Sequence, residues 1–338
     1  MNPERSQFAP DAASDTRSGI ASASPYRERV TSTAERPEGA RRLLSTAEGA
    51  SAAAFAPLDW TLLLVASGIW GASFLLIAEG LESLAPGTIT LLRIVFGWLA
   101  LATLPGARRT RIEAEDRPRI ALVGLLWMAL PMTMFPIAEQ WISSSITGML
   151  NGSLPLFAAA VAAIMLRRPP GRLQQAGILV GFLGVVAISL PSMQGGSRTA
   201  LGAALVLVAM VSYGVATNLI VPLQHRYGAL PIIWRAQMVA IVLAAPYGLA
   251  GLSASSFAWG PVAAVVVLGA FGTGFAFVAA GTLIGRVGAT RGAVLAYIIP
   301  VIALVLGVVL RDEHVAALAI AGLGLVLAGA WLTSRAGH

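Results

Sequence analysis

The sequence contains no cysteine, and none of its 23 basic residues is a lysine. Without cysteine the chain forms no disulfide, carries no thiol nucleophile and offers no cysteine ligand to a metal. Charged residues are also scarce, at 12% of the chain, where soluble domains carry about 25%. With a hydrophobic content of 57%, this scarcity indicates a membrane protein with several spans.

Residues that carry chemistry are missing from the interiors of the apolar segments. The three histidines, His225, His314 and His338, fall at segment ends or beyond, and no His-Glu-x-x-His motif occurs. An intramembrane enzyme needs a nucleophile with its base, or metal ligands, at membrane depth. We therefore expect no catalytic residue, no metal site and no cofactor. A nucleic-acid partner is not expected either, because the arginines lie in short gaps between apolar runs rather than on one polar face.

The apolar segments begin near residue 60 and number ten. A helix needs roughly 20 apolar residues to cross the ~30 Å hydrocarbon layer, which is the length scale of these segments. The gaps are brief, so successive helices should pack antiparallel. The expected fold is an all-α membrane protein with ten transmembrane helices over residues 60–78, 86–104, 119–138, 145–166, 173–190, 200–220, 231–250, 261–284, 289–310 and 315–333.

Residues 1–57 precede the first span. They are rich in serine, alanine, proline, arginine and glutamate without a sustained apolar period, so we expect a disordered cytoplasmic arm. The compact apolar core of a signal peptide is not found near the start. For part of this arm the alternative is a start codon placed too far upstream.

The arginines predict the orientation. If the first span starts in the cytoplasm, the outer loops hold only Arg198 and Arg311. The inner loops hold eleven arginines: Arg108, Arg109, Arg111, Arg117, Arg119, Arg167, Arg168, Arg172, Arg226, Arg286 and Arg291. Because cytoplasmic loops carry the excess of basic residues, both termini should be cytoplasmic, in the plasma (bacterial inner) membrane.

Two stretches of the chain repeat each other. Residues 148–166 resemble residues 292–310, and a shift of 145 positions places Pro155 under Pro300. The same shift pairs Gly177 with Gly322 and Gly184 with Gly329. Because each repeat has five spans, an odd number, the second must enter the membrane upside down. The sequence thus predicts two inverted five-helix repeats, residues 58–190 and 199–334, with a site near the midplane.

The chain resembles the EamA-type transporters of the drug/metabolite transporter superfamily, over roughly residues 60–333. The resembling pieces are residues 70–74, Arg93, residues 154–156, residues 269–273, Pro300, Glu313 and Gly322. The resemblance implies a ten-helix, five-plus-five inverted repeat around a central cavity, exporting small metabolites or drugs. One position departs from the pattern: the family commonly has an acid after span four, where this chain has Arg168.

Prolines mark the helices that should be interrupted. Pro155 frees the carbonyl of Asn151, which forms either a notch that contacts the substrate or a tolerated kink. Pro300 has the same two interpretations. In span three, Pro131 and Pro136 indicate either a flexible, gating helix or a structural bend.

Polar and aromatic side chains within the spans are candidates for the cavity. Aromatic walls with scattered hydroxyls and amides suit an amphiphilic organic solute, and helix packing is the alternative for each residue. Arg93 and Arg235 lie well inside predicted spans. Each either contacts a gate or a bound anion, or extends its side chain to the lipid headgroups. Glycines of spans five and ten indicate close helix contacts, within one chain or in a homodimer. The cavity candidates are Trp70, Ser73, Asn151, Pro155, Tyr213, Thr217, Asn218, Thr273, Phe277, Tyr297 and Pro300.

The resulting hypothesis is a carrier of small organic solutes that works by alternating access, exporting metabolites or amino-acid-like compounds. A channel-like facilitator or a non-transporting sensor is the alternative. Since every acid of the span region falls in a loop or at a span end, we expect no buried carboxylate to act as a proton switch. Glu139 is the exception. If span three ended a few residues later than predicted, Glu139 would lie within the membrane and would be a coupling site.

Overall fold

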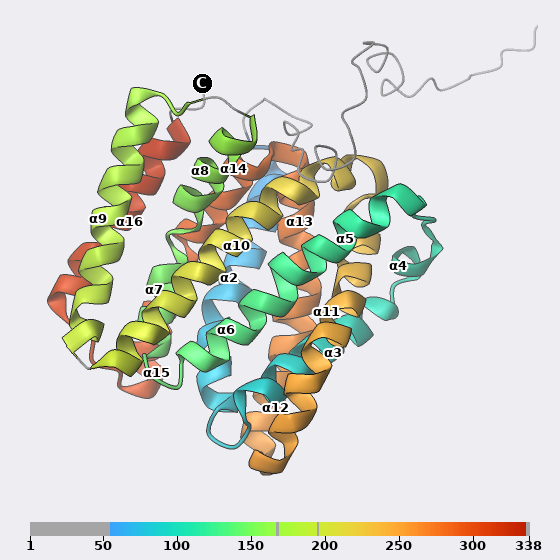
Figure 1. The fold of residues 1–338 in the computed structure, drawn as a ribbon, viewed down its shortest axis with the longest axis horizontal. Helices are drawn as coiled ribbons and strands as arrows, with labels where there is room; N and C mark the ends of the chain where they lie inside the picture. The colour runs from blue at the N-terminus through green and yellow to red at the C-terminus, as the bar shows by residue number, and fades with distance from the viewer. Residues whose placement is uncertain (1–54, 167–168, 195, 336–338) are drawn as a thin grey trace, which may run out of the picture. The chain divides into compact units, whose positions relative to one another are not determined.

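The computed structural model describes residues 55–166, 169–194 and 196–335. They belong to one compact unit, Gly39–His338, and the regular structure of the described residues is helical, with no strand (Figure 1). The expected arm, residues 1–57, lies outside the described residues except for positions 55–57.

The helices of the first half carry most of the side chains discussed below. They are α2 (Pro57–Gly80), α3 (Pro86–Ala102), α4 (Pro105–Arg109), η1 (Ala114–Asp116), α5 (Arg117–Val123), η2 (Gly124–Ala129), α6 (Leu130–Ala138), α7 (Ser144–Asn151), α8 (Leu154–Leu166) and α9 (Arg172–Gln194).

The second half repeats this succession of long and interrupted helices. It comprises α10 (Ser197–Tyr227), α11 (Ala229–Gly251), η3 (Leu252–Ala254), α12 (Trp259–Val267), η4 (Leu268–Phe275), α13 (Ala276–Val287), α14 (Ala289–Gly292), η5 (Ala293–Tyr297), α15 (Ile299–Arg311) and α16 (Ala317–Arg335).

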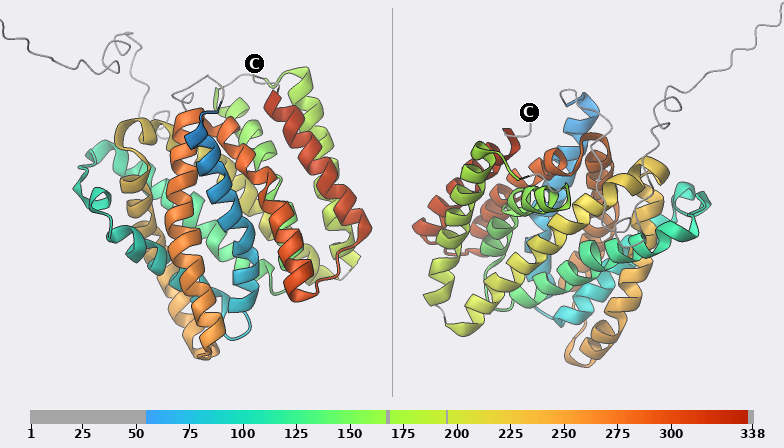
Figure 2. Two further views of the ribbon diagram at one scale, coloured as in Figure 1. Left: turned by 180° about the vertical axis from the view of Figure 1, so that it is seen from behind. Right: turned by 45° about the horizontal axis from the view of Figure 1, so that its top comes forward.

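Eight helical stretches of the described residues are long and apolar enough to cross a membrane, and Pro86–Ala102 and Ala317–Thr333 are shorter apolar helices. Each overlaps one of the ten predicted segments. Pro57 and Pro86 begin α2 and α3, where the missing N–H costs nothing because the first turn has no intrahelical acceptor. In Figure 2, α2, drawn in blue, lies beside α13 and α15 of the second half.

Two helices contain a π-helical segment. In the third span this is η2, which ends two residues before Pro131, whose missing N–H interrupts the regular ladder. In the eighth span it is η4, which contains Gly269, Gly272 and Gly274. A shift of 145 positions from Gly124, where η2 begins, leads to Gly269 within η4. Such segments are frequent at functional sites.

The predicted breaks at Pro155 and Pro300 are confirmed as helix starts. Gly152 and Ser153 separate α7 from α8, and α15 begins directly before Pro300 after the 3₁₀ segment η5. The two breaks face each other: a Cβ added to Gly152 would lie 3.0 Å from Cγ of Pro300. Close approach of two interrupted helices brings non-helical backbone into the protein interior, where membrane proteins tolerate it.

The glycines of spans five and ten pack α9 against α16 within one chain, side by side in Figure 1. A Cβ on Gly177 would lie 2.6 Å from the carbonyl oxygen of Gly329, and one on Gly184 the same distance from that of Gly322. These contacts favour the within-chain alternative for the glycine faces.

Candidate functional site

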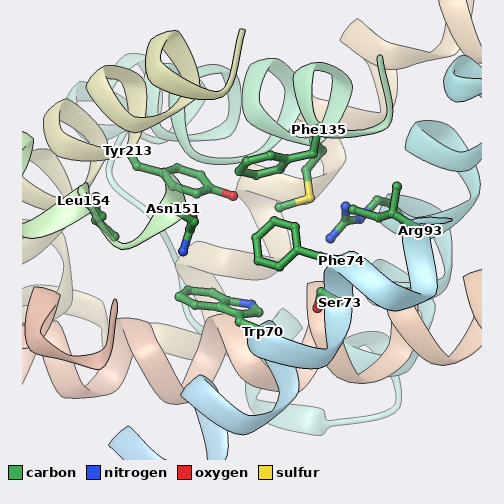
Figure 3. Close-up of a pocket in the computed structure, with 10 residues that line it drawn as sticks. Trp70, Ser73, Phe74, Arg93, Phe135, Asn151, Leu154 and Tyr213 are labelled. Atoms are coloured by element: carbon green, nitrogen blue, oxygen red, sulfur yellow. The ribbon is translucent and has the colours of Figure 1, made fainter. Parts of the chain in front are cut away.

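A buried cavity lies between α2, α3, α6, α10 and the break that separates α7 from α8. Its free space is about 30 Å³, far below the roughly 300–1,000 Å³ of pockets that hold organic ligands. An organic solute therefore enters only if the surrounding helices part. The lining residues, drawn in Figure 3, are Trp70, Ser73, Phe74, Ile77, Arg93, Met132, Phe135, Asn151, Leu154 and Tyr213.

Aromatic rings form the walls. The ring centroids of Phe74 and Phe135 are 5.5 Å apart in an edge-to-face arrangement, and Phe135 lies 6.0 Å from Tyr213. Trp70 is fixed by a 2.9 Å hydrogen bond from its Nε1 to the carbonyl oxygen of Gly272 and by edge contact with Phe277. These rings offer apolar area that loses little side-chain entropy when it binds a ligand, since each has few rotatable bonds.

Arg93 closes one end of the cavity, and Figure 3 shows its guanidinium pointing toward the rings. The residue is 2% exposed, so it does not reach out to the headgroups. Its Nε donates a 3.2 Å hydrogen bond to Oγ1 of Thr273, whereas Nη1 is buried with no hydrogen-bond partner. Among the described residues no carboxylate oxygen lies within ion-pair distance of this guanidinium.

The position of Arg93 depends on glycines where α3 meets η4. A Cβ on Gly97 would lie 2.9 Å from the carbonyl oxygen of Gly269, and one on Gly269 would lie 2.8 Å from that of Arg93. Side chains at either position would push the helices apart. The two glycines thus let α3 approach η4 closely enough for Arg93 to reach Thr273.

Glu139 directly follows the last residue of α6, as expected for an acid at a span end, yet both of its carboxylate oxygens are buried without a hydrogen-bond partner. Burial raises the pKa of Glu139 well above the ordinary 4.5, the carboxylate of Glu313 raises it further, and Arg93 and Arg311 oppose the rise. Glu139, the exception named from the sequence, therefore has a buried carboxylate at a span end, and its action as a proton switch stays a prediction.

Glu313 has the opposite environment. It accepts hydrogen bonds from the backbone N–H of Ser144 at 3.0 Å, from the Ser144 hydroxyl at 2.6 Å and from the N–H of Ser145 at 2.8 Å. Burial alone would raise the pKa of Glu313, but these hydrogen bonds outweigh burial and lower it. Glu313 thus satisfies the free N–H groups at the start of α7, which also has its own cap, Ser143.

Of the predicted cavity residues, Trp70, Ser73, Asn151 and Tyr213 line the cavity together with Arg93. Thr273 and Phe277 lie just behind, against Arg93 and Trp70 respectively. The cavity lining does not include the remaining candidates: Thr217, Asn218, Pro155, Pro300 and Tyr297.

These remaining candidates have other contacts. The Asn218 amide donates to the carbonyl oxygens of Ala158 and Gly214. The Thr217 hydroxyl donates to the carbonyl of Gly214, and that of Tyr297 to the carbonyl of Ala330.

Arg235 lies apart from this cavity. Its guanidinium donates to the carbonyl oxygens of Ala107, Pro231 and Thr110 at 2.9, 3.0 and 2.7 Å, which ties α11 to the segment around α4. It also lines a pocket rich in arginine, together with Arg108, Arg109, Arg111 and Arg117.

Five lining residues were missing from the sequence prediction: Phe74, Ile77, Met132, Phe135 and Leu154. Helical spacing could have found two of them. Phe74 and Ile77 are four and seven positions after the predicted Trp70, on the same face of α2.

One acidic cluster could hold a metal by its geometry. The carboxylate oxygens of Glu113, Glu115 and Asp116 lie within 4.8 Å of one another. Nη1 of Arg226 is already 2.8 Å from Asp116 and 3.4 Å from Glu115, so this cluster has a cation of its own.

Comparison with known proteins gives a consistent result. The model of the EamA-like transporter family matches residues 60–190 and again residues 200–335. An uncharacterized transporter of Archaeoglobus fulgidus is 26% identical over 82% of this chain and 98% of its own length. YedA, an uncharacterized inner membrane transporter of Escherichia coli K12, is 26% identical over 77% of this chain and 85% of its own.

A solved crystal structure of a protein aligns with a TM-score of 0.59 at 18% identity, covering 81% of this chain and 95% of that chain. At this identity the match indicates a shared fold.

Proposed function

The chain belongs to the EamA-like transporter family, and on that premise we propose that this multi-pass membrane transporter exports small organic solutes, metabolites or amino-acid-like compounds, by alternating access around the cavity. The observation that carries the proposal is the small aromatic cavity in the interior of the helices, lined mostly by buried residues, with polar groups at Arg93, Asn151 and Tyr213. Carriers enclose their site from both sides in an intermediate state, and a channel needs a continuous path instead.

The two-repeat architecture supports this mechanism. The family model matches twice, and eight membrane-length stretches plus two shorter apolar helices agree in number with two sets of five. Corresponding helices also make corresponding contacts with the opposite half. The second span, α3, packs on η4, and the seventh span, α11, packs on η2. We take residues 58–190 and 199–334 as inverted repeats, with both termini in the cytoplasm. The pocket rich in arginine around Arg235 supports that orientation.

The cavity is lined unequally by the two repeats. Nine of its ten lining residues come from the first half, and Tyr213 alone comes from the second. Trp70-Gly71 resembles Tyr213-Gly214, and this shift of 143 positions pairs Phe74 with Thr217. The shift of 145 positions pairs Met132 with Phe277. The counterparts Thr217 and Phe277 are 1% and 0% exposed. If the repeats exchange conformations, the packed counterparts should line the site when it opens to the other side.

Glu139 is our candidate for energy coupling. Proton-driven carriers need a titratable group that binds a proton on one side and releases it on the other. Glu139 has buried, unpartnered carboxylate oxygens and lies in the electrostatic field of Arg93. Uphill accumulation in liposomes driven by a pH gradient, and abolished by Glu139→Gln, is the expected result. Equal downhill flux with and without the gradient, in both proteins, would refute the assignment.

The test of the function is a thermal-shift screen of the purified protein against a metabolite panel, followed by flux of the hits in liposomes. Saturable flux is expected. High conductance that does not saturate would instead identify a channel, and binding without flux would identify a sensor.

A further inference from the structure

Arg93 is a buried cation without an anion. It is 2% exposed, and its Nη1 has no hydrogen-bond partner although the atom is shielded from solvent. A buried charge is retained at a large cost in solvation unless a counter-charge compensates it. Its hydrogen-bond partner, the Thr273 hydroxyl, supplies no charge. Among the described side chains, no carboxylate therefore lies within ion-pair distance of Arg93 to compensate its charge.

The unpartnered nitrogen belongs to a residue that lines the cavity. Figure 3 shows the guanidinium directed at the space between Phe74 and Phe135, with Asn151 and Leu154 at the opposite end. A ligand in this space meets a positive charge at one end and aromatic or aliphatic surface along its length. This geometry matches a molecule that has one charged end and an apolar body.

We propose that the cavity binds an amphiphilic organic monocarboxylate, whose carboxylate pairs with Nη1 of Arg93 and whose aromatic or branched body packs against Trp70, Phe74 and Phe135. This assignment rests on the proposed carrier function and specifies its substrate class. Guanidinium and carboxylate form short charge-assisted hydrogen bonds, which are stronger than those between neutral groups.

Other substrate classes fit the same lining less well. No acidic residue is among the lining residues, so an amine would have no counter-charge there. A zwitterionic amino acid would leave its ammonium group to Asn151 and to hydroxyls. The Ser73 hydroxyl already donates to the carbonyl of Ile69, which leaves few polar groups for a sugar. A phosphate dianion calls for more positive charge than one guanidinium supplies.

Glu139 is the one nearby acid that could compete. It interacts electrostatically with Arg93, but no ion pair joins them, and both of its oxygens lack a partner. If Glu139 were the true counter-ion of Arg93, the cavity would have no preference for an anion. The experiment must therefore separate a ligand's charge from its shape.

The experiment compares ligands with one body and different ends: 3-phenylpropionate, its amide and 3-phenylpropylamine, with a branched 2-oxo acid as a further carboxylate. Binding to the purified protein in detergent is measured by tryptophan fluorescence, since Trp70 lines the site. The wild type should bind 3-phenylpropionate roughly ten- to hundredfold more tightly than the amide, the range expected for a hydrogen bond to a charged group. The amine should bind most weakly.

Arg93→Gln should reduce this carboxylate-to-amide ratio to within about threefold. Arg93→Lys keeps the charge and should keep part of the preference for carboxylate over amide. This variant provides the comparison if Arg93→Gln does not fold. Arg111→Gln removes the same charge from an exposed loop and is the matched control, expected to retain the wild-type ratio.

The proposal is overturned if the wild type binds no carboxylate of the panel saturably, if it prefers the amide or the amine, or if Arg93→Gln keeps the preference. Failure of the carrier function would look different. In that case carboxylates would bind with the expected preference but would show no saturable flux in liposomes. Saturable flux of uncharged solutes, without carboxylate preference, would refute only the substrate class.

Discussion

Arg93 on α3 and Thr273 on η4 lie 180 positions apart in the chain and meet through a 3.2 Å hydrogen bond from Nε to Oγ1. The bond connects the two halves of the protein. It also holds one edge of the guanidinium against η4, which leaves Nη1 for the cavity. The orientation of the buried charge therefore depends on a hydroxyl of the opposite half.

Thr273→Val removes this hydroxyl at nearly constant volume. A hydrogen bond to a charged group contributes about 1.5–3 kcal/mol, so the free energy of unfolding should fall by about that amount. Denaturant titration in detergent measures the change. Thr282→Val is the matched control, because the Thr282 hydroxyl bonds only to Val278 of its own helix. Equal losses in both variants would contradict a special role for Thr273.

The stability of the wild type should fall as the pH rises above the ordinary glutamate pKa of 4.5. The folded state binds the Glu139 proton more tightly than the unfolded state, because the pKa of Glu139 is raised on folding. The contribution of Glu139 to stability is therefore greatest below 4.5 and declines by about 1.4 kcal/mol per pH unit until its folded pKa is passed. Thermal melting across pH in wild type and Glu139→Gln measures this. The variant should lack the decline, and identical profiles would count against the assignment.

Glu313→Gln should lower the free energy of unfolding by about 1.5–3 kcal/mol, because it replaces charge-assisted bonds to Ser144 and Ser145 at the start of α7. The comparison is Glu82→Gln, whose carboxylate is half exposed beside Arg311 and should contribute about 1 kcal/mol or less. A larger loss for Glu82→Gln would show that the part-buried contact of Glu313 with Ser144 and Ser145 is unimportant.

Paired cysteines test the exchange of conformations between the repeats. In this cysteine-free chain, Phe74→Cys should react with an impermeant thiol reagent on intact cells, and its counterpart Thr217→Cys in inside-out vesicles. Both reactions should be slow, because the two positions are 4% and 1% exposed in this conformation. Arg198→Cys and Arg111→Cys report the outer and inner sides. Labelling of positions 74 and 217 from the same side only would exclude the exchange.

The sequence predicted the helices well because each helical stretch is long, apolar and bounded by proline, glycine or arginine. It also located the breaks at Pro155 and Pro300, since a proline cannot continue the backbone ladder. Half of the cavity lining was found because Trp70, Ser73, Arg93, Asn151 and Tyr213 are polar or aromatic residues in apolar surroundings.

The misses have a physical reason. Phe74, Met132 and Leu154 are ordinary core residues by type, and only the packing of several helices makes them line a cavity. Glu139 was predicted at a span end, where its backbone is, but the burial of its oxygens depends on neighbouring helices. The contact of Arg93 with Thr273 joins two distant segments, and no local pattern records it.

The most direct test of the carrier account is counterflow in liposomes that contain the purified protein. Vesicles are loaded with unlabelled 3-phenylpropionate and diluted into a trace of the labelled compound. A carrier that alternates around one site should accumulate label transiently above equilibrium, and Arg93→Gln should abolish this overshoot. Label that rises monotonically to equilibrium, at a rate independent of the internal solute and unsaturated by external solute, would contradict alternating access.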